Sequence, residues 1–115
     1  MHELGITRSI VAIVDEAARG RRVLRVTLEV GKLSGVETSA IAFCFDIVAR
    51  GTALDGATLE IREIEGRARC RTCGAELAVA SLFAACGCGA RDLELVRGEE
   101  LKVKTMELAD STAAP

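Results

Sequence analysis

Aromatic side chains are scarce in this 115-residue sequence, which contains three Phe and neither Trp nor Tyr. Proteins that bind single-stranded nucleic acid combine stacking rings with clustered Lys and Arg. Here 15 basic residues stand against 17 acidic ones, for a formal net charge of -2. The composition therefore argues against a nucleic-acid partner.

Long hydrophobic runs are missing as well. No apolar stretch approaches the length of about 18 residues that a membrane-spanning helix needs. The start of the chain, Met1-His2-Glu3, lacks the basic residues of a secretory signal, and Asp15 and Glu16 interrupt the apolar residues behind it. We therefore expect a cytoplasmic protein without a membrane partner.

Histidine occurs once, as His2, so a mechanism that needs an internal histidine base is excluded. A chain of 115 residues holds one domain, or one domain with a small insert, which excludes a large multi-step enzyme. Half of the residues are hydrophobic and 28% are charged. This composition is typical of a folded protein.

Two stretches have the spacing of amphipathic helices. Apolar residues at positions 6, 10, 13, 14 and 17 predict a helix over residues 4–19, with Gly20 as a stop signal. In the second stretch, apolar residues stand at i, i+3, i+4 and i+7 from Ile41, and Gly51 follows. Cys44 lies on the apolar face of this helix, which favours a place in the core over a role as a metal ligand.

Alternation of apolar and polar residues predicts strands elsewhere. The first covers residues 23–30, and its apolar face consists of Leu24, Val26, Leu28 and Val30. A second strand contains Leu59 and Ile61. Residues 93–108 alternate in two pieces, and Gly98 between them predicts a turn or bulge.

Four of the five cysteines fall in an insert that runs from Gly66 to about Asp92, is poor in bulky apolar groups and is too small to fold unassisted. Cys70 and Cys73 form a CxxC pair, and a CxC pair, Cys86 and Cys88, begins thirteen residues after Cys73. Two such loops can supply four thiolates to a tetrahedral ion, which suits a closed, structural Zn(II) site. The bound ion would supply the folding energy that the insert lacks.

A redox dithiol at Cys70 and Cys73 is the competing interpretation. Such motifs are expected near a helix N-terminus in a βαβ pattern, which the sequence does not show. Arg67, Arg69 and Arg71 alternate around the first cysteine. They could favour the thiolates or meet an acidic partner, although an ordinary solvated face is the simpler interpretation.

The N-terminus offers a second set of metal ligands. His2 places an imidazole beside the α-amine of Met1, and the backbone amide between them can deprotonate in the presence of a strongly binding ion. Ni(II) and Cu(II) prefer such a nitrogen-rich planar set, to which Glu3 could add its backbone amide or its carboxylate. Because free α-amines and free imidazoles both exchange protons near neutral pH, binding would be reversible, which suits a carrier.

Several motifs taken together resemble the HypA/HybF family of nickel-delivering hydrogenase maturation proteins. In chain order they are Met1-His2-Glu3-Leu4, residues 30–37 (VGKLSGVE), residues 50–52 (RGT), the CxxC pair, and residues 98–104 (GEELKVK). The resemblance implies an α+β fold in which two helices pack on a three-stranded sheet. The implied nickel-binding domain covers residues 1–66 and 98–109, a small zinc-ribbon-like domain is inserted at residues 67–97, and residues 110–115 form a flexible tail.

The resemblance also implies the metal ligands. The nickel site would begin at the N-terminus with Met1, His2 and Glu3, and Glu37 falls where some relatives have an acidic residue near nickel. The second zinc pair is one residue shorter than the CxxC that relatives usually have. The implied zinc ligands are Cys70, Cys73, Cys86 and Cys88.

The implied function is that of an accessory protein and not of an enzyme. The chain would carry Ni(II) toward the large subunit of a nickel-iron hydrogenase, together with a hydrogenase maturation GTPase, as a monomer or weak homodimer. The alternative is a zinc-ribbon module for protein interaction or regulation that transports no nickel.

Overall fold

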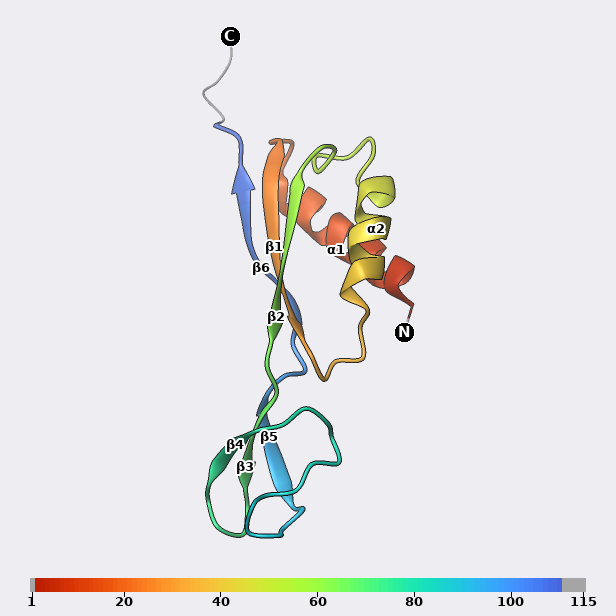
Figure 1. Ribbon diagram of the computed structural model, residues 1–115. Helices are drawn as coiled ribbons and strands as arrows, with labels where there is room; N and C mark the ends of the chain where they lie inside the picture. Colours follow the sequence, from red (N-terminus) through yellow and green to blue (C-terminus); the bar gives the residue numbers. More distant parts are fainter. Residues whose placement is uncertain (1, 111–115) are drawn as a thin grey trace. The chain divides into compact units, whose positions relative to one another are not determined.

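The structure is a computed structural model that describes residues 2–110, so Met1 and residues 111–115 of the predicted tail lie outside the described residues. Within this range the strands form two three-stranded sheets, ordered β2-β1-β6 and β4-β3-β5 (Figure 1). The predicted α+β class, with two helices on a three-stranded sheet and a small inserted part, is confirmed. In chain order the elements are α1 (Glu3–Ala18), β1 (Val23–Gly31), α2 (Thr38–Val48), β2 (Thr58–Ile64), β3 (Arg67–Cys70), β4 (Glu76–Ala78), β5 (Leu93–Arg97) and β6 (Leu101–Leu108).

The described residues divide into two compact units. The helical unit comprises residues 2–28, 37–61 and 103–110, and the cysteine unit comprises residues 29–36 and 62–102. The cysteine unit therefore takes in residues on both sides of the insert predicted at 67–97. The domain boundaries expected from the sequence stay a prediction.

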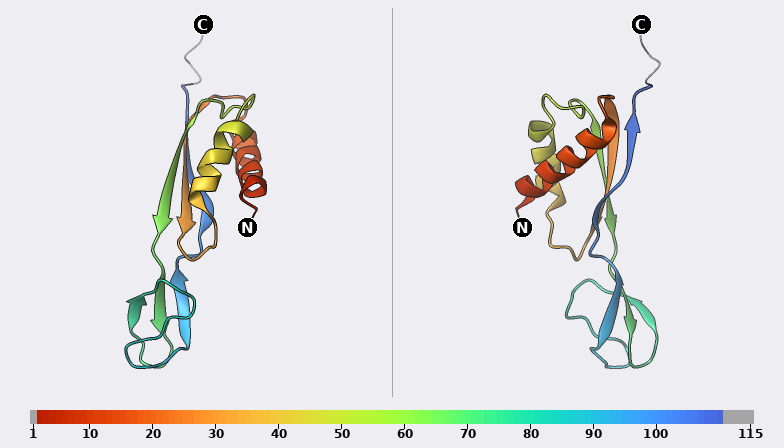
Figure 2. Two further views of the ribbon diagram at one scale, coloured as in Figure 1. Left: turned by 45° about the vertical axis from the view of Figure 1, so that its right-hand side comes forward. Right: turned by 180° about the vertical axis from the view of Figure 1, so that it is seen from behind.

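In the helical unit, α1 and α2 lie on the same face of the sheet β2-β1-β6 (Figure 2). Helix α1 ends within one residue of the expected position, where Arg19 takes a left-handed conformation with a φ of 52°. The buried side chains of α1 contact the sheet and α2 and form much of the core. They are Thr7, Ile10, Val11, Val14 and Ala18.

The buried face of α1 differs from the predicted one. Ile13 was expected in the apolar stripe but is 62% exposed, whereas Thr7 is fully buried. Burial of Thr7 is tolerated because its hydroxyl donates a hydrogen bond to the carbonyl oxygen of Glu3 at 2.7 Å. A satisfied polar side chain therefore occupies a core position that hydrophobic spacing alone did not predict.

The central strand β1 buries Val26, Leu28 and Val30 as predicted, but the polar residue Thr27 between them is buried as well. The prediction that Leu24 lies on the buried face is wrong, because Leu24 is 47% exposed and Val23 is buried in its place. The N–H of Val23 donates to the carbonyl oxygen of Ala53 at 2.8 Å. The segment before β2 therefore pairs with this end of β1, and the burial pattern shifts there.

Three glycines pack closely in the cysteine unit. A Cβ atom on Gly31 would overlap the carbonyl group of Gly98, and a Cβ atom on Gly98 would lie 2.7 Å from the Cα atom of Gly66. Gly98 has a φ of 122°, which glycine adopts without strain, and it separates β5 from β6 as predicted. Only residues without a side chain fit this crossing of backbones.

The second sheet belongs wholly to the cysteine unit. Strand β3 pairs antiparallel with β4 and with β5. Strands β3 and β4 are four and three residues long, too short for alternation to reveal them in the sequence. This sheet holds the first of the two cysteine loops.

Candidate metal sites

The first cysteine loop connects β3 to β4. The N–H of Cys70 donates to the carbonyl oxygen of Ala75 at 2.8 Å, and the N–H of Gly74 donates to the carbonyl oxygen of Cys70 at 2.8 Å. Gly74 has a φ of 79°, in the left-handed region that glycine tolerates best. The turn places the sulfur atoms of Cys70 and Cys73 within 4.8 Å of each other.

The second loop repeats this turn with one residue fewer. The N–H of Cys86 donates to the carbonyl oxygen of Ala90 at 2.8 Å, and the N–H of Gly89 donates back to the carbonyl oxygen of Cys86 at 2.8 Å. The outer hydrogen bond therefore spans residues 86–90 here, against residues 70–75 in the first loop. The tighter turn absorbs the shorter CxC spacing, and the sulfur of Cys88 still reaches the cluster.

The four sulfur atoms lie within 4.8 Å of one another. The shortest separations join the two loops: 3.8 Å between Cys70 Sγ and Cys88 Sγ, and 3.6 Å between Cys73 Sγ and Cys86 Sγ. Four sulfurs placed at the Zn–S distance of about 2.3 Å around a tetrahedral ion would be separated by roughly 3.8 Å. The donor set and its spacing fit a closed zinc site.

The environment of Cys70 favours its thiolate form. The N–H of Cys73 donates to Cys70 Sγ at 3.5 Å, and this bond, with a second one from the Thr72 N–H, lowers the pKa of Cys70 to about 6 against the opposing effect of burial. Thiolates are the form that binds metal. Cys70 and Cys86 are buried, whereas Cys73 and Cys88 are exposed, so each loop contributes one sulfur from each environment.

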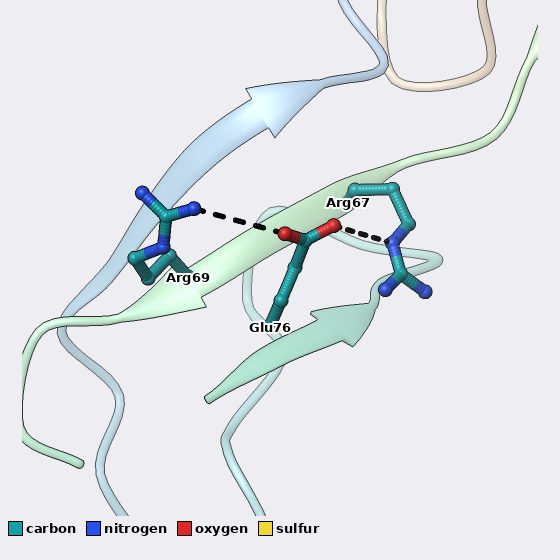
Figure 3. A network of polar contacts seen from close by, with 3 residues as sticks. All are labelled: Arg67, Arg69 and Glu76. Atoms are coloured by element: carbon teal, nitrogen blue, oxygen red, sulfur yellow. Dashed lines mark hydrogen bonds and ion pairs between the residues drawn. The ribbon is translucent and has the colours of Figure 1, made fainter. Parts of the chain in front are cut away.

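The arginines around Cys70 take part in ion pairs. Arg67 Nε lies 3.2 Å from Glu76 Oε1, and Arg69 Nη2 lies 3.7 Å from Glu76 Oε2 (Figure 3). Arg71 Nη1 lies 2.8 Å from Asp92 Oδ1. Because side chains alternate along a strand, Arg67 and Arg69 share the face of β3 opposite to Cys70. These pairs are exposed and fit the simple interpretation of a solvated face.

Cys44 belongs to the helical unit and is not among the four cysteines of the cluster. It is half-buried on α2, whose fully buried side chains are Ile41 and Phe45. All five cysteines are free thiols in the structure. The four cysteines of the insert therefore form the sulfur cluster without Cys44.

The predicted nickel residues lie at the start of α1. His2 precedes the helix and is exposed, and Glu3 is its first residue. The carboxylate oxygen Oε2 of Glu3 accepts a hydrogen bond from the N–H of Glu37 at 3.0 Å. This bond, followed by the N–H of Glu3 itself, holds the pKa of the Glu3 carboxyl below its usual value.

Backbone hydrogen bonds define the first turn of α1. The N–H of Ile6 donates to the carbonyl oxygen of His2 at 3.1 Å, and the hydroxyl of Thr7 donates to the carbonyl oxygen of Glu3. The first N–H groups of a helix have no partner within the helix, so the amide nitrogens of His2 and Glu3 do not take part in its ladder. The sequence did not point to Thr7, although a Thr four residues after a helix start is the available signal.

Two helices on one sheet and a four-sulfur cluster on another define a small metal-binding protein. A family model described as "Hydrogenase/urease nickel incorporation, metallochaperone, hypA" matches residues 1–108. The hydrogenase maturation factor HypA of Nostoc sp. is 56% identical over 110 residues, which cover 96% of this chain and 97% of that protein. The same factor from Geobacter metallireducens is 50% identical over 109 residues, or 94% and 99% of the two chains.

Among solved structures, the solution structure of the Ni metallochaperone HypA from Helicobacter pylori matches with a TM-score of 0.67 at 20% sequence identity. The match covers 94% of this chain and 97% of that one. The chain belongs to the HypA family of hydrogenase maturation factors. No helix in residues 2–110 combines the length and apolar character needed to cross a membrane.

Proposed function

We propose that this chain binds Ni(II) at its N-terminus and delivers it during the maturation of a nickel-iron hydrogenase. Membership of a family described by nickel incorporation supports this role. The observation that carries it is the position of His2, exposed and directly before α1. The chain acts as a carrier and not as a catalyst.

The proposed ligands are the α-amine of Met1, the amide and imidazole nitrogens of His2, and Glu3. The amide nitrogens of His2 and Glu3 carry the N–H groups that a helix leaves without an internal acceptor. Their deprotonation upon metal binding would therefore break no hydrogen bond of the helical ladder. A set of nitrogen ligands suits Ni(II) better than a tetrahedral ion such as Zn(II).

We assign a structural Zn(II) to Cys70, Cys73, Cys86 and Cys88. The fit of the sulfur separations to a tetrahedral ion supports this assignment. Four protein ligands leave no open position, so this metal would stay bound while nickel is exchanged. Cysteines that bind zinc must stay reduced, and we place the transfer in the cytoplasm.

The receiving protein in this proposal is the large subunit of the hydrogenase, and a maturation GTPase assists the transfer. The family description and the names of the relatives support a place in hydrogenase maturation. Nickel would leave by ligand exchange, because amine and imidazole ligands compete with protons near neutral pH.

A nickel titration of zinc-loaded protein tests the proposal. The native chain is compared with the same chain extended by a few residues before Met1, and with His2→Ala. We expect one nickel ion to bind the native chain and none to bind the other two, with zinc content unchanged in all three. Equal binding by the native and extended chains would exclude the N-terminal site and favour the zinc-ribbon interaction module. Loss of zinc in His2→Ala would contradict separate roles for the two metals.

A further inference from the structure

We infer that a turn beside the second cysteine loop docks this chain onto the protein that receives the nickel. The turn comprises residues 81–84 and presents Leu82 and Phe83, and we call it the Leu82–Phe83 turn. Its partner is an apolar pocket on the large subunit of the hydrogenase. The inference rests on the proposed function and names the surface through which the chain meets its receiver.

The Leu82–Phe83 turn carries the two most exposed large apolar side chains of the cysteine unit. Leu82 is 59% exposed and Phe83 is 85% exposed, against 43% for Val96 and 39% for Leu101. Scattered exposed apolar residues need no explanation, whereas a contiguous apolar patch often marks an interaction site. The adjacent side chains of Leu82 and Phe83 form such a patch.

Local hydrogen bonds order the Leu82–Phe83 turn. The hydroxyl oxygen of Ser81 accepts the N–H of Phe83 at 3.0 Å, and the carbonyl oxygen of Ser81 accepts the N–H of Ala84 at 3.3 Å. A serine hydroxyl that binds the backbone two residues later closes a turn of its own. The side chain of Phe83 therefore projects from a defined backbone.

The segments on both sides of the turn are anchored in the cysteine unit. Before the turn, Val79 is buried, and its N–H donates to the carbonyl oxygen of Gly66 at 2.9 Å. After the turn, Cys86 is buried and belongs to the sulfur cluster. Groups that are held in place before binding lose less conformational entropy when they bind. The assigned zinc ion would thus also serve to hold the docking surface.

Charged side chains are missing from this part of the chain. Residues 77–90 contain no Asp, Glu, Lys or Arg, although 28% of the whole chain is charged. The buried centre of a protein interface is depleted of charged residues and enriched in aromatic ones, and an uncharged segment can be buried without the cost of removing a charge from water. The complementary surface is therefore apolar and uncharged.

The size of the turn argues against a second copy of this chain as the partner. Burial of Leu82 and Phe83 removes about 300 Å² of surface from water. Two such turns packed against each other would bury about 600 Å², well below the roughly 1,200 Å² of a stable interface. A protruding side chain contributes more when it fills a pocket at the centre of a larger contact.

The receiver of the metal offers such a pocket for a chemical reason. A protein that is to bind a buried metal needs an entry path to the site, and sites of this kind are concave and mostly apolar. The maturation GTPase only assists the transfer in the proposed function, so the same argument does not extend to it. We therefore assign the turn to the large subunit.

Calorimetric titration of the purified, nickel-free large subunit with the zinc-loaded chain tests the assignment. Phe83→Ala should weaken binding by roughly 10- to 100-fold, the loss typical of a central interface residue, and Leu82→Ala by roughly 3- to 10-fold. Phe83→Leu keeps an apolar side chain and should retain most of the affinity. Phe43→Ala is the matched control, because Phe43 is 73% exposed on α2, and it should leave binding unchanged. Zinc content and nickel binding should stay the same in every variant.

Several outcomes would overturn the docking assignment while the carrier function stands. These are a native chain that binds nickel but not the large subunit, equal binding by the native chain and Phe83→Ala, and equal losses in Phe83→Ala and Phe43→Ala. A loss in Phe83→Ala that affects only the GTPase, or only self-association in sedimentation, would assign the turn to another partner. If the native chain binds no nickel at its N-terminus, the proposed function fails, whereas a specific loss of large-subunit binding in Phe83→Ala would still support the docking surface.

Discussion

The helical unit and the cysteine unit are stabilised by different means. In the helical unit, α1, α2 and β1 all bury large apolar side chains, among them Val14, Val26, Leu28, Ile41 and Phe45. In the cysteine unit, the buried apolar residues besides two cysteines are Val30, Ala68 and Val79. The helical unit therefore has a hydrophobic core, whereas the cysteine unit has few buried apolar residues and a cluster of four sulfurs.

Large apolar side chains of the cysteine insert are exposed to solvent. Leu82 and Phe83 are 59% and 85% exposed, although they are among the largest apolar groups that the insert contains. A segment that leaves such groups in water gains little from hydrophobic burial. A bound ion that cross-links two loops can supply the missing stability, and this is the role we assign to zinc.

Loss of the metal from the cysteine unit should have the largest effect on the protein. Removal of zinc by a strong chelator should unfold the cysteine loops and leave the helices in place, because zinc modules gain about 10 to 16 kcal/mol from their ion. Amide resonances in residues 67–97 should collapse to positions typical of an unfolded chain, while those of α1 and α2 stay dispersed. Collapse of both sets together would show that the helical unit also depends on the metal.

Single cysteine variants identify the zinc ligands. Cys86→Ser should lower zinc content and loosen the insert, because Cys86 Sγ lies 3.6 Å from Cys73 Sγ. Cys44→Ser should leave zinc content unchanged, since this residue stands outside the cluster. The reverse result in metal analysis would show that Cys44 is a zinc ligand.

A reversible disulfide between Cys70 and Cys73 without bound zinc would instead support the redox interpretation.

A core substitution in the helical unit should have the next largest effect. Phe45 is only 2% exposed, and Phe45→Ala should destabilise the helical unit by about 3 to 5 kcal/mol through the cavity that it leaves. Phe43 lies on the same helix but is 73% exposed, so Phe43→Ala is the matched control and should change stability by less than about 0.5 kcal/mol. Chemical denaturation followed by circular dichroism measures both, and equal losses would refute the assigned core.

A smaller effect concerns the glycine crossing. Gly31→Ala places a methyl group against the carbonyl of Gly98, and overpacking of this kind destabilises by about 1 to 3 kcal/mol. Gly5→Ala is the control, because nothing lies within 4 Å of a Cβ atom there and alanine favours a helix by about 1 kcal/mol over glycine. Thermal unfolding should therefore shift in opposite directions, and a shift in the same direction would contradict the close packing at Gly31.

In the helical unit, local sequence patterns predicted the positions of helices and strands better than they predicted which side chains are buried. The spacing of apolar residues located α1 to within one residue at each end. It assigned Ile13 to the core because spacing counts side chains by type, whereas burial of Thr7 depends on the hydrogen bond that satisfies its hydroxyl. Strands β3 and β4 escaped prediction because segments of four and three residues carry too little periodicity.

The sequence by itself determined the four cysteines of the cluster, the helices and the resemblance to the HypA family, because cysteine spacing and hydrophobic periodicity are local properties of the chain. Tertiary structure decided how the shortened CxC pair still reaches the cluster, since this depends on a turn that closes between Cys86 and Ala90. It also decided the partner of the Glu3 carboxylate. Glu37 is 34 residues away, and only the packing of α1 against α2 brings its N–H within hydrogen-bonding distance.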